Sequence, residues 1–301
     1  MENTIFVLGA HDPEMKKIED LLILLGYPFS YALQGVERSN VSNAYKSTHF
    51  DFFESSIIYI ECNAVHKSNI EILIDHHNPG DYGYDLDYNQ FVEASSVGQF
   101  FRYILLNDYD YVTTILNLKT KPIKSEINEH MYYEENDGWY LDTEKGSARI
   151  PDDVVLLSGI DHCLIDAYKG KCKGINTNNL FNVRVKQISE DLNVPEKELW
   201  DIANKYENKI RYFGKILDFT DLNMGNTIYS PKYLILRELS ISKNVPIALK
   251  ITYDGLEKIM FLSLEKNEVE ELLKVKEFKG IKLHDMFGVP NRGYAGGFII
   301  K

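Results

Sequence analysis

Cysteine is scarce in this chain and shows no metal-binding pattern. Only three of the 301 residues are cysteine, Cys62, Cys163 and Cys172, and none of them forms a Cys-x-x-Cys pair. An odd number without that spacing indicates neither a disulfide framework nor a zinc ribbon. We therefore expect the protein in a reducing cytoplasm.

Long apolar runs are also missing. The first apolar segment, Ile5–Ala10, is too short for the hydrophobic region of a signal peptide and has no basic flank. No run approaches the roughly 18 apolar residues that a membrane span needs. The sequence therefore predicts neither secretion nor a membrane partner.

Positive charge is in short supply. The chain holds 33 Lys and Arg against 45 Asp and Glu, a formal net charge of −12, and it has no long basic run. Sequence-independent binding of long nucleic acid depends on many phosphate contacts, so we do not expect it here. A small anionic substrate, held by metal ions and a few basic groups, is compatible with this charge. The hydrophobic content of 44% is ample for a globular core.

What the sequence does contain is an apolar run, Ile70–Ile74, that ends abruptly in Asp75, His76 and His77. A β-branched run of this length predicts a buried strand, so the three polar side chains would lie where that strand leaves the sheet. The corresponding edge is the usual place for chemistry in an open α/β fold.

Three further apolar runs are predicted to be buried strands, and each is followed by carboxylates, in two cases with a neighbouring imidazole. In chain order they are Ile5–Leu8 before His11, Asp12 and Glu14; Ser56–Ile60 before Glu61; and Val154–Leu157 before Asp161 and His162. In a parallel sheet such strand ends lie side by side, so we expect these groups to converge. Taken alone, Asp12 and Glu14 favour a structural interpretation, as the N-cap and first-turn acid of a helix from Pro13 to Gly26.

Two segments after the triplet leave alternatives open. The Tyr-rich loop Asp81–Tyr88 is either a lid that stacks on a base or ordinary loop packing, and we favour packing. A helix is predicted over Phe91–Leu106, and the hydroxyls of Ser95 and Ser96 near its start either hold a phosphate or cap the helix.

The second half of the chain predicts a different organisation. Residues 119–148 lack a clean period and predict a loop or hairpin insertion, and residues 176–219 predict amphipathic helices that connect two domains. The remaining elements expected are helices at Tyr233–Leu239 and Glu268–Leu273 and antiparallel strands at Pro246–Thr252 and Ile259–Leu264.

The chain closes with Gly288–Phe298, predicted to be a Gly-rich loop around Arg292. Gly296 and Gly297 would permit close backbone approach and Arg292 would bind a phosphate or carboxylate, or else the segment is a tight turn with a surface arginine. We therefore expect an α/β protein with a mainly parallel sheet flanked by helices (1–180), a helical connector (181–222) and a smaller α+β C-terminal domain (223–301).

Carboxylates and imidazoles without a thiolate cluster suit Mn²⁺ or Mg²⁺ rather than structural zinc. Two such ions bridged by a carboxylate activate water and neutralise a phosphoryl group. The residues thus predict hydrolysis of a phosphoester or phosphoanhydride.

The order Asp12-x-Glu14, Glu61, Asp75-His76-His77 and Asp161 resembles the DHH phosphoesterase superfamily. That superfamily includes manganese-dependent pyrophosphatases, exopolyphosphatases, single-strand exonucleases and phosphodiesterases that degrade very short RNAs or cyclic dinucleotides. The resemblance covers roughly the first 180 residues, and Arg292 with its glycines loosely resembles the family's substrate loop. It implies that Asp12, Glu14, Glu61, His76 and Asp161 are metal ligands.

The resemblance also implies roles for the two other members of the triplet. Asp75 would orient the ring of His76 from behind, and His77 would face the substrate and protonate the leaving oxygen.

The chain departs from the family in its first motif. The family has a histidine four positions before its first aspartate, where this chain has Leu8, and His11 is the nearby substitute ligand. Glu14 and Glu61 stand where aspartate is usual. The ion count is therefore one or two, and two hypotheses follow: a Mn²⁺-dependent phosphohydrolase of a small phosphorylated or nucleotide substrate, and a non-catalytic nucleotide-binding or interaction protein. A homo-oligomer stays open.

Overall fold

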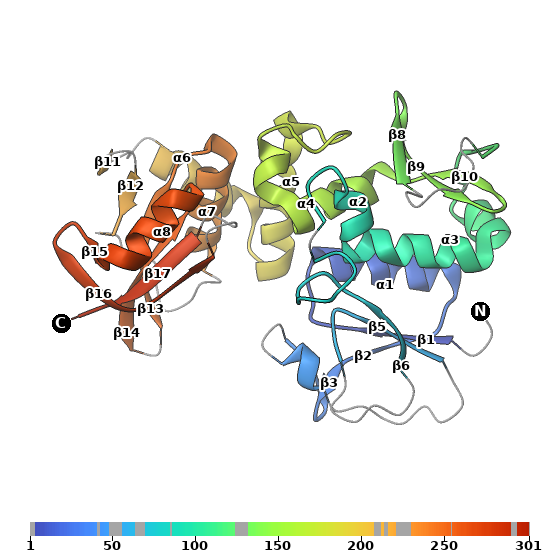
Figure 1. Cartoon of the computed structure of the whole chain (residues 1–301), viewed down its shortest axis with the longest axis horizontal. Coiled ribbons are helices and arrows are strands. Elements are labelled where there is room, and N and C mark those ends of the chain that lie inside the picture. The colour runs from blue at the N-terminus through green and yellow to red at the C-terminus, as the bar shows by residue number, and fades with distance from the viewer. Residues whose placement is uncertain are drawn as a thin grey trace. The chain divides into compact units, whose positions relative to one another are not determined.

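The computed structural model divides the chain into two compact units, Met1–Ile175 and Asn176–Lys301 (Figure 1). Each unit has its own core and is described by itself. The residues described are 4–40, 43–47, 56–63, 70–84, 86–123, 132–207, 212–213, 216–220, 230–253, 255–289 and 294–300.

The first unit is built on a parallel sheet whose strands end in register. Among the described residues its order is β2-β1-β5-β6, and all three pairings are parallel. Leu8 pairs with Ile60, and Ile60 pairs with Ile74, so the residues that follow these three strands leave the sheet at one edge. The strands are β1 (Thr4–Leu8), β2 (Phe29–Tyr31), β5 (Ser56–Ile60) and β6 (Ile70–Ile74).

Helices of this unit pack over the sheet and around its carboxyl edge. Helices α1 and α3 lie side by side over one face of the sheet (Figure 1), and the short helix Ala44–Lys46 packs on the opposite face. The helices are α1 (Pro13–Leu25), α2 (Phe91–Ala94), α3 (Ser96–Ile115) and α4 (Asp152–Tyr168). The predicted helix from Pro13 to Gly26 is confirmed, with Asp12 as its N-cap and Gly26 in the left-handed conformation at its end.

The stretch 119–148 contains a small antiparallel sheet, so the hairpin interpretation of this stretch is confirmed where the structure describes it. Its order is β7-β10-β9-β8. The strands are β7 (Thr120–Lys121), β8 (Tyr132–Glu135), β9 (Gly138–Thr143) and β10 (Gly146–Arg149).

A second hairpin joins β3 (Leu33–Gln34) to β4 (Glu37–Arg38).

The predicted fourth strand, Val154–Leu157, is wrong, because these residues lie inside helix α4. A four-residue apolar run is too short for its period to separate a buried strand from a buried helix. The helix follows Pro151, and Asp152 and Asp153 in its first turn complement its dipole. Asp161 therefore belongs to a helix and not to a strand end.

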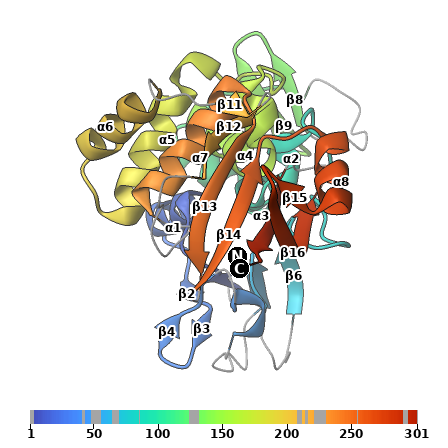
Figure 2. The same cartoon turned by 90° about the vertical axis from the view of Figure 1, so that its left-hand side faces the viewer.

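The second unit is α+β. Its described sheet has the order β11-β12-β13-β14-β17-β16-β15 and is antiparallel except for the β12–β13 pair (Figure 2). The strands are β11 (Tyr212–Phe213), β12 (Ile216–Phe219), β13 (Ile247–Tyr253), β14 (Leu256–Leu262), β15 (Glu277–Phe278), β16 (Ile281–Val289) and β17 (Tyr294–Ile299).

Helices cover both faces of this sheet. Leu236 of α7 packs with Leu249 and Ile251 on one face, and Val269 of α8 packs with Phe261 on the other. Helices α5 and α6, in the stretch predicted to connect two domains, share a core with α7 in this unit. The helices are α5 (Thr177–Leu192), α6 (Glu196–Glu207), α7 (Pro231–Lys243) and α8 (Lys266–Val275). The predicted α/β class with a smaller α+β C-terminal part is confirmed.

The predicted Gly-rich loop at the end of the chain is corrected in part. Gly296 and Gly297 lie in strand β17, while Arg292 lies outside the described residues. A Cβ atom on Gly296 would lie 2.6 Å from the Phe287 ring, and one on Gly297 would lie 2.2 Å from the sulfur of Met286. These two glycines therefore make room for side chains of the neighbouring strand β16.

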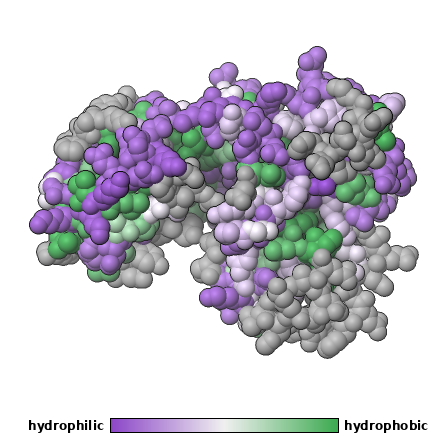
Figure 3. All heavy atoms as spheres, viewed as in Figure 1, coloured by the Kyte–Doolittle hydropathy of each residue, from purple (hydrophilic) through white to green (hydrophobic). Residues whose placement is uncertain are grey.

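In the part of the chain that the structure describes, no helix combines the length and apolar character needed to cross a bilayer. Figure 3 shows hydrophilic side chains spread over the drawn face of both units.

Asp218 of β12 allows a test of the second unit's stability. Its carboxylate forms an ion pair with Lys279. It also accepts hydrogen bonds from the backbone N–H of Thr220 at 3.0 Å and from the Thr220 hydroxyl at 2.6 Å. Burial alone would raise the pKa of Asp218, but these bonds lower it. Asp218 therefore contributes stability above its unfolded pKa, and the contribution is lost as the pH falls through the folded pKa.

We expect Asp218→Asn to cost about 1–3 kcal/mol at neutral pH, since a charge-assisted network is weakened. The difference in melting temperature from the wild type should shrink as the pH falls below about 4. Calorimetry of the full chain measures both. Asp110→Asn, which breaks an exposed pair with Lys145, is the control and should change little. An Asp218→Asn deficit that is constant from neutral to acid pH would contradict the prediction.

Candidate metal centre

Four side chains from four elements meet at the carboxyl edge of the parallel sheet in the first unit. Glu14 comes from the first turn of α1, Glu61 follows β5, His76 follows β6, and Asp161 projects from α4. One ligand atom of each lies within 4.8 Å of the others. His76 Nε2 is 2.9 Å from Asp161 Oδ2 and 3.8 Å from Glu61 Oε1.

The backbone at Glu61 is held in an unusual conformation. Its φ is +50°, in the left-handed region that costs a residue with a side chain about 1 kcal/mol or more. The N–H of Glu61 donates to Ile74 O at 3.0 Å, and a Cβ atom on Gly9 would lie 2.4 Å from the Glu61 carbonyl oxygen. The sharp turn after β5, packed against a glycine after β1, therefore aims the Glu61 carboxylate at the cluster.

Glu14 is buried at the start of helix α3. Its Oε1 accepts a hydrogen bond from the N–H of Val97 at 2.6 Å, where the positive end of the α3 dipole favours a negative charge. Among the described residues, Glu14 Oε2 and Glu61 Oε1 are buried without a hydrogen-bond partner. Buried carboxylate oxygens of this kind can accept a bond from a positively charged ligand.

The three carboxylates of the cluster perturb one another. Burial, followed by the charges of Asp161 and Glu61, raises the pKa of Glu14. Burial, followed by the charges of Asp12 and Asp161, raises the pKa of Glu61. For Asp161, burial alone would raise the pKa, but the contact with His76 holds it at about 2.

A divalent cation would offset this repulsion, because buried charges of one sign are stable only with a counter-charge. Three carboxylates and one imidazole, with no thiolate among them, form a ligand set that suits Mn²⁺ or Mg²⁺. The residues present therefore fit a divalent metal ion.

Asp75 fixes the turn that carries both histidines. Its fully buried carboxylate accepts hydrogen bonds from the backbone N–H of His76 at 2.7 Å and of His77 at 3.0 Å, and Tyr45 donates to it at 2.8 Å. The same carboxylate lies 3.0 Å from His77 Nδ1. Asp75 thus holds the backbone of His76 but the ring of His77, which differs from the predicted role of orienting the His76 ring.

His77 lies at the rim of the cluster. Its side chain is 41% exposed, and its Nδ1 is 3.8 Å from Glu61 Oε1. Burial alone would lower the pKa of His77, but the Asp75 hydrogen bond and the charges of Glu61 and Asp161 raise it to about 9. These neighbours therefore favour the protonated imidazole.

The structure does not bring the other two predicted ligands into the cluster. His11 is exposed, and Asp12 uses its carboxylate to cap α1 through the N–H of Met15 at 2.7 Å. Asp12 is near enough for its charge to raise the pKa of Glu61. The N-cap predicted for Asp12 is confirmed, and its role as a metal ligand stays a prediction.

The predicted substrate residues Ser95 and Ser96 have no exposed surface. Ser95 caps α3 by accepting from the N–H of Gly98 at 3.1 Å, and its hydroxyl donates to Ser158 at 2.8 Å. The capping alternative therefore describes Ser95. Substrate binding by Arg292, Gly296 and Gly297 in the second unit stays a prediction.

Sequence reasoning assigned no role to His162 of α4. Its Nδ1 lies 3.4 Å from His76 Nδ1, and its Nε2 lies 2.8 Å from Leu86 O. Its place next to Asp161 was the available signal. Tyr45, which donates to Asp75, carries no local signal, because a long chain segment separates the two residues.

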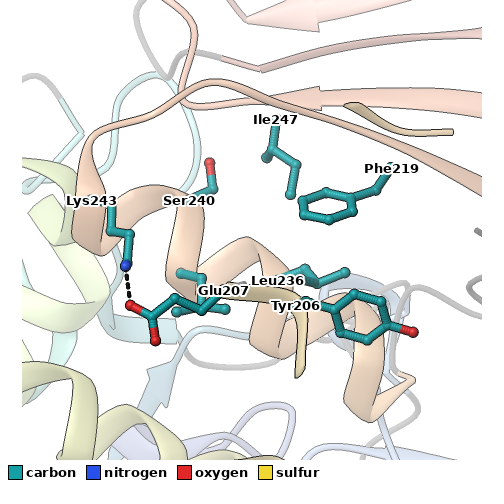
Figure 4. A pocket seen from close by; sticks show the side chains of 8 residues that line it. Tyr206, Glu207, Phe219, Leu236, Ser240, Lys243 and Ile247 are labelled. Atoms are coloured by element: carbon teal, nitrogen blue, oxygen red, sulfur yellow. Dashed lines mark hydrogen bonds and ion pairs between the residues drawn. The ribbon is translucent and has the colours of Figure 1, made fainter. Parts of the chain in front are cut away.

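An apolar pocket in the second unit is too small to be a substrate site. Figure 4 shows it between Tyr206, Phe219, Leu236 and Ile247, with the Glu207–Lys243 ion pair beside it. Its volume of about 20 Å³ holds little more than one water molecule.

Comparisons with known proteins add no evidence for the function of this site. No protein-family model matches the sequence, and no curated protein matches it. One similar solved structure is a pGpG-specific phosphodiesterase, PggH, from Vibrio cholerae, with 14% identity and a TM-score of 0.40 over 99% of this chain and 93% of the other. A likeness this loose is no evidence for a shared activity.

Gly83 tests how tightly the cluster is packed. A Cβ atom there would lie 2.0 Å from Ala94 O and 2.7 Å from His76 Cβ. We expect Gly83→Ala to cost about 1–3 kcal/mol by overpacking and to weaken Mn²⁺ binding, because His76 is displaced. Thermal unfolding and Mn²⁺ titration measure the two effects.

Gly35→Ala is the control, since its Cβ would meet open space and only its φ of +66° is strained. It should lower stability by about 1 kcal/mol and leave Mn²⁺ binding unchanged. Wild-type Mn²⁺ affinity in Gly83→Ala would show that the close approach does not matter.

Proposed function

We propose that this protein is a Mn²⁺-dependent phosphohydrolase of a small phosphorylated or nucleotide-like substrate. The observation that carries the proposal is the cluster of three carboxylates and one imidazole, in which Glu14, Glu61 and His76 are buried. Among the described residues, Glu14 Oε2 and Glu61 Oε1 have no hydrogen-bond partner. The DHH-like order of the same residues along the chain supports the reaction class.

Each member of the site has a distinct task in this proposal. Glu14, Glu61, His76 and Asp161 would hold the ion, which when bound lowers the pKa of a water molecule and neutralises phosphoryl charge. Mg²⁺ is the alternative ion, and one ion accounts for the four residues that the geometry brings together.

His77 is suited to proton donation. Asp75 holds its Nδ1 at 3.0 Å, so the second ring proton is on Nε2, at the end of a side chain that is 41% exposed. The Asp75 hydrogen bond favours the charged ring, which can donate this proton to a leaving oxygen. Asp75 orients the donor and stabilises its charge.

Glu61→Gln tests the metal site by stability. In metal-free protein it removes one of three repelling carboxylates, so we expect a higher melting temperature than the wild type. Wild-type protein with Mn²⁺ at about 100 times its Kd should gain about 2.7 kcal/mol, and the variant should gain much less. The exposed Glu198→Gln is the control and should behave as wild type. Equal Mn²⁺-induced shifts in the variant and the wild type would remove Glu61 from the site.

A hydrolysis screen with Mn²⁺ over pyrophosphate, short dinucleotides and cyclic dinucleotides tests the reaction. We expect turnover of at least one compound, loss of it in His76→Ala, and a fall in kcat of about 10²–10⁴ in His77→Ala, because a proton donor is removed. His77→Ala should keep most of its Mn²⁺ affinity, since four ligands remain.

The rival function has its own outcome in the same screen. Full Mn²⁺ loading of the wild type with no turnover of any phosphorylated compound would reject the hydrolase and favour a non-catalytic nucleotide-binding protein on the same scaffold.

A further inference from the structure

The ring of His76 is contacted at both of its nitrogens. Nε2 faces the acids of the cluster, 2.9 Å from Asp161 Oδ2 and 3.8 Å from Glu61 Oε1. A histidine binds a metal ion through a bare nitrogen, so ligation through Nε2 requires the ring proton to be on Nδ1. The group that contacts Nδ1 therefore decides whether the His76 ring has its proton on Nδ1 and a bare Nε2 for the metal ion.

The atom opposite His76 Nδ1 is Nδ1 of His162, at 3.4 Å. The two ring centroids are 5.4 Å apart, with an interplanar angle of 36°. Asp75, the residue expected from sequence to orient this ring, contacts only the backbone N–H of His76. In the described structure, the side chain that contacts His76 Nδ1 is therefore that of His162, and not that of Asp75.

A backbone carbonyl decides which nitrogen of His162 carries the proton. His162 Nε2 lies 2.8 Å from Leu86 O, and a carbonyl oxygen can only accept a hydrogen bond. The proton of a neutral His162 ring is therefore on Nε2, which leaves Nδ1 as an acceptor. That acceptor matches a proton on His76 Nδ1, and the two bonds form a relay from the Leu86 carbonyl to the metal-binding nitrogen.

Helix α4 supplies both groups that flank His76. Asp161 and His162 are consecutive, and the next residue, Cys163, has non-helical angles (φ −141°, ψ 42°). The helix is kinked at the position where two neighbouring side chains contact opposite nitrogens of one imidazole.

We propose that His162 is a positioning residue that sets the tautomer and orientation of His76 for metal binding. The proposal rests on the metal site of the proposed function and adds a residue that does not touch the ion. Partners of this kind make the ligand more basic and change metal affinity by about 10–100-fold.

Three substitutions of His162 separate its contact with His76 from its contact with Leu86. His162→Asn keeps an oxygen acceptor at the position of Nδ1, His162→Gln keeps a polar group at the position of Nε2, and His162→Phe keeps only the ring shape. We expect Mn²⁺ affinity to fall about 10–100-fold in the Gln and Phe variants and to recover largely in the Asn variant.

The measurement is a titration of the full-length, metal-free protein with Mn²⁺ alone, in which the electron paramagnetic resonance signal of free Mn²⁺ gives the Kd. His284→Phe, which removes an exposed imidazole from the second unit, is the matched control and should bind as wild type. Melting temperatures of the metal-free variants test for a structural effect. If His162 has a purely structural role, the Mn²⁺ affinity of each variant should fall in step with its melting temperature. The proposal predicts instead that affinity is high only in the variants that keep an acceptor at the position of His162 Nδ1.

The outcomes separate this inference from the proposed function. Wild-type affinity in His162→Phe, or equal losses in the Asn and Gln variants, would overturn the role of His162 and leave the metal site standing. A wild-type protein that binds no Mn²⁺ would overturn both.

Discussion

The structure of the first unit depends on one electrostatic constraint, the burial of several carboxylates at the edge of a parallel sheet. Glu14, Glu61 and Asp161 share a space in which ligand atoms lie within 4.8 Å of one another, and burial raises the pKa of the first two. Such an arrangement opposes folding unless a positive charge occupies the centre. The N-terminus of α3 and the ring of His76 offset part of this charge, and a divalent ion would offset the rest.

Several separate features converge to hold these acids. The matched ends of β1, β5 and β6 bring three loops to one edge, and Gly9 lets two of those loops touch. The left-handed turn at Glu61 is a local cost that the surrounding packing sustains. Helix α4 then adds Asp161 from above the edge and completes the set.

Adjacent histidines acquire different chemistry from their surroundings. His76 is buried between Asp161 and His162 and presents a nitrogen to the cluster. His77 is half exposed, and the hydrogen bond from its Nδ1 to Asp75 favours the charged ring. In the proposed function the same residue type would supply a metal ligand and a proton donor, two tasks that require opposite protonation of the ring.

The sequence by itself determined the features that depend on local pattern. Short β-branched runs predicted β1, β5 and β6, and the Asp12-Pro13 start and the Gly26 end predicted α1. The acids and imidazoles after the apolar runs predicted a metal site, and the family resemblance implied the ligands Asp12, Glu14, Glu61, His76 and Asp161, with His11 as a substitute. These signals are local because a strand or a helix cap is specified by residues close in the chain.

Only the tertiary structure decided the features that depend on contacts between distant segments. It placed Val154–Leu157 in a helix, left His11 outside the cluster, turned Ser95 into a buried cap and put His162 behind His76. The four apolar residues Val154–Leu157 fit a buried strand and a buried helix equally well, so the segments that pack around them decide that they form a helix. The partner of an imidazole nitrogen is likewise set by packing between elements, which no spacing in the sequence records.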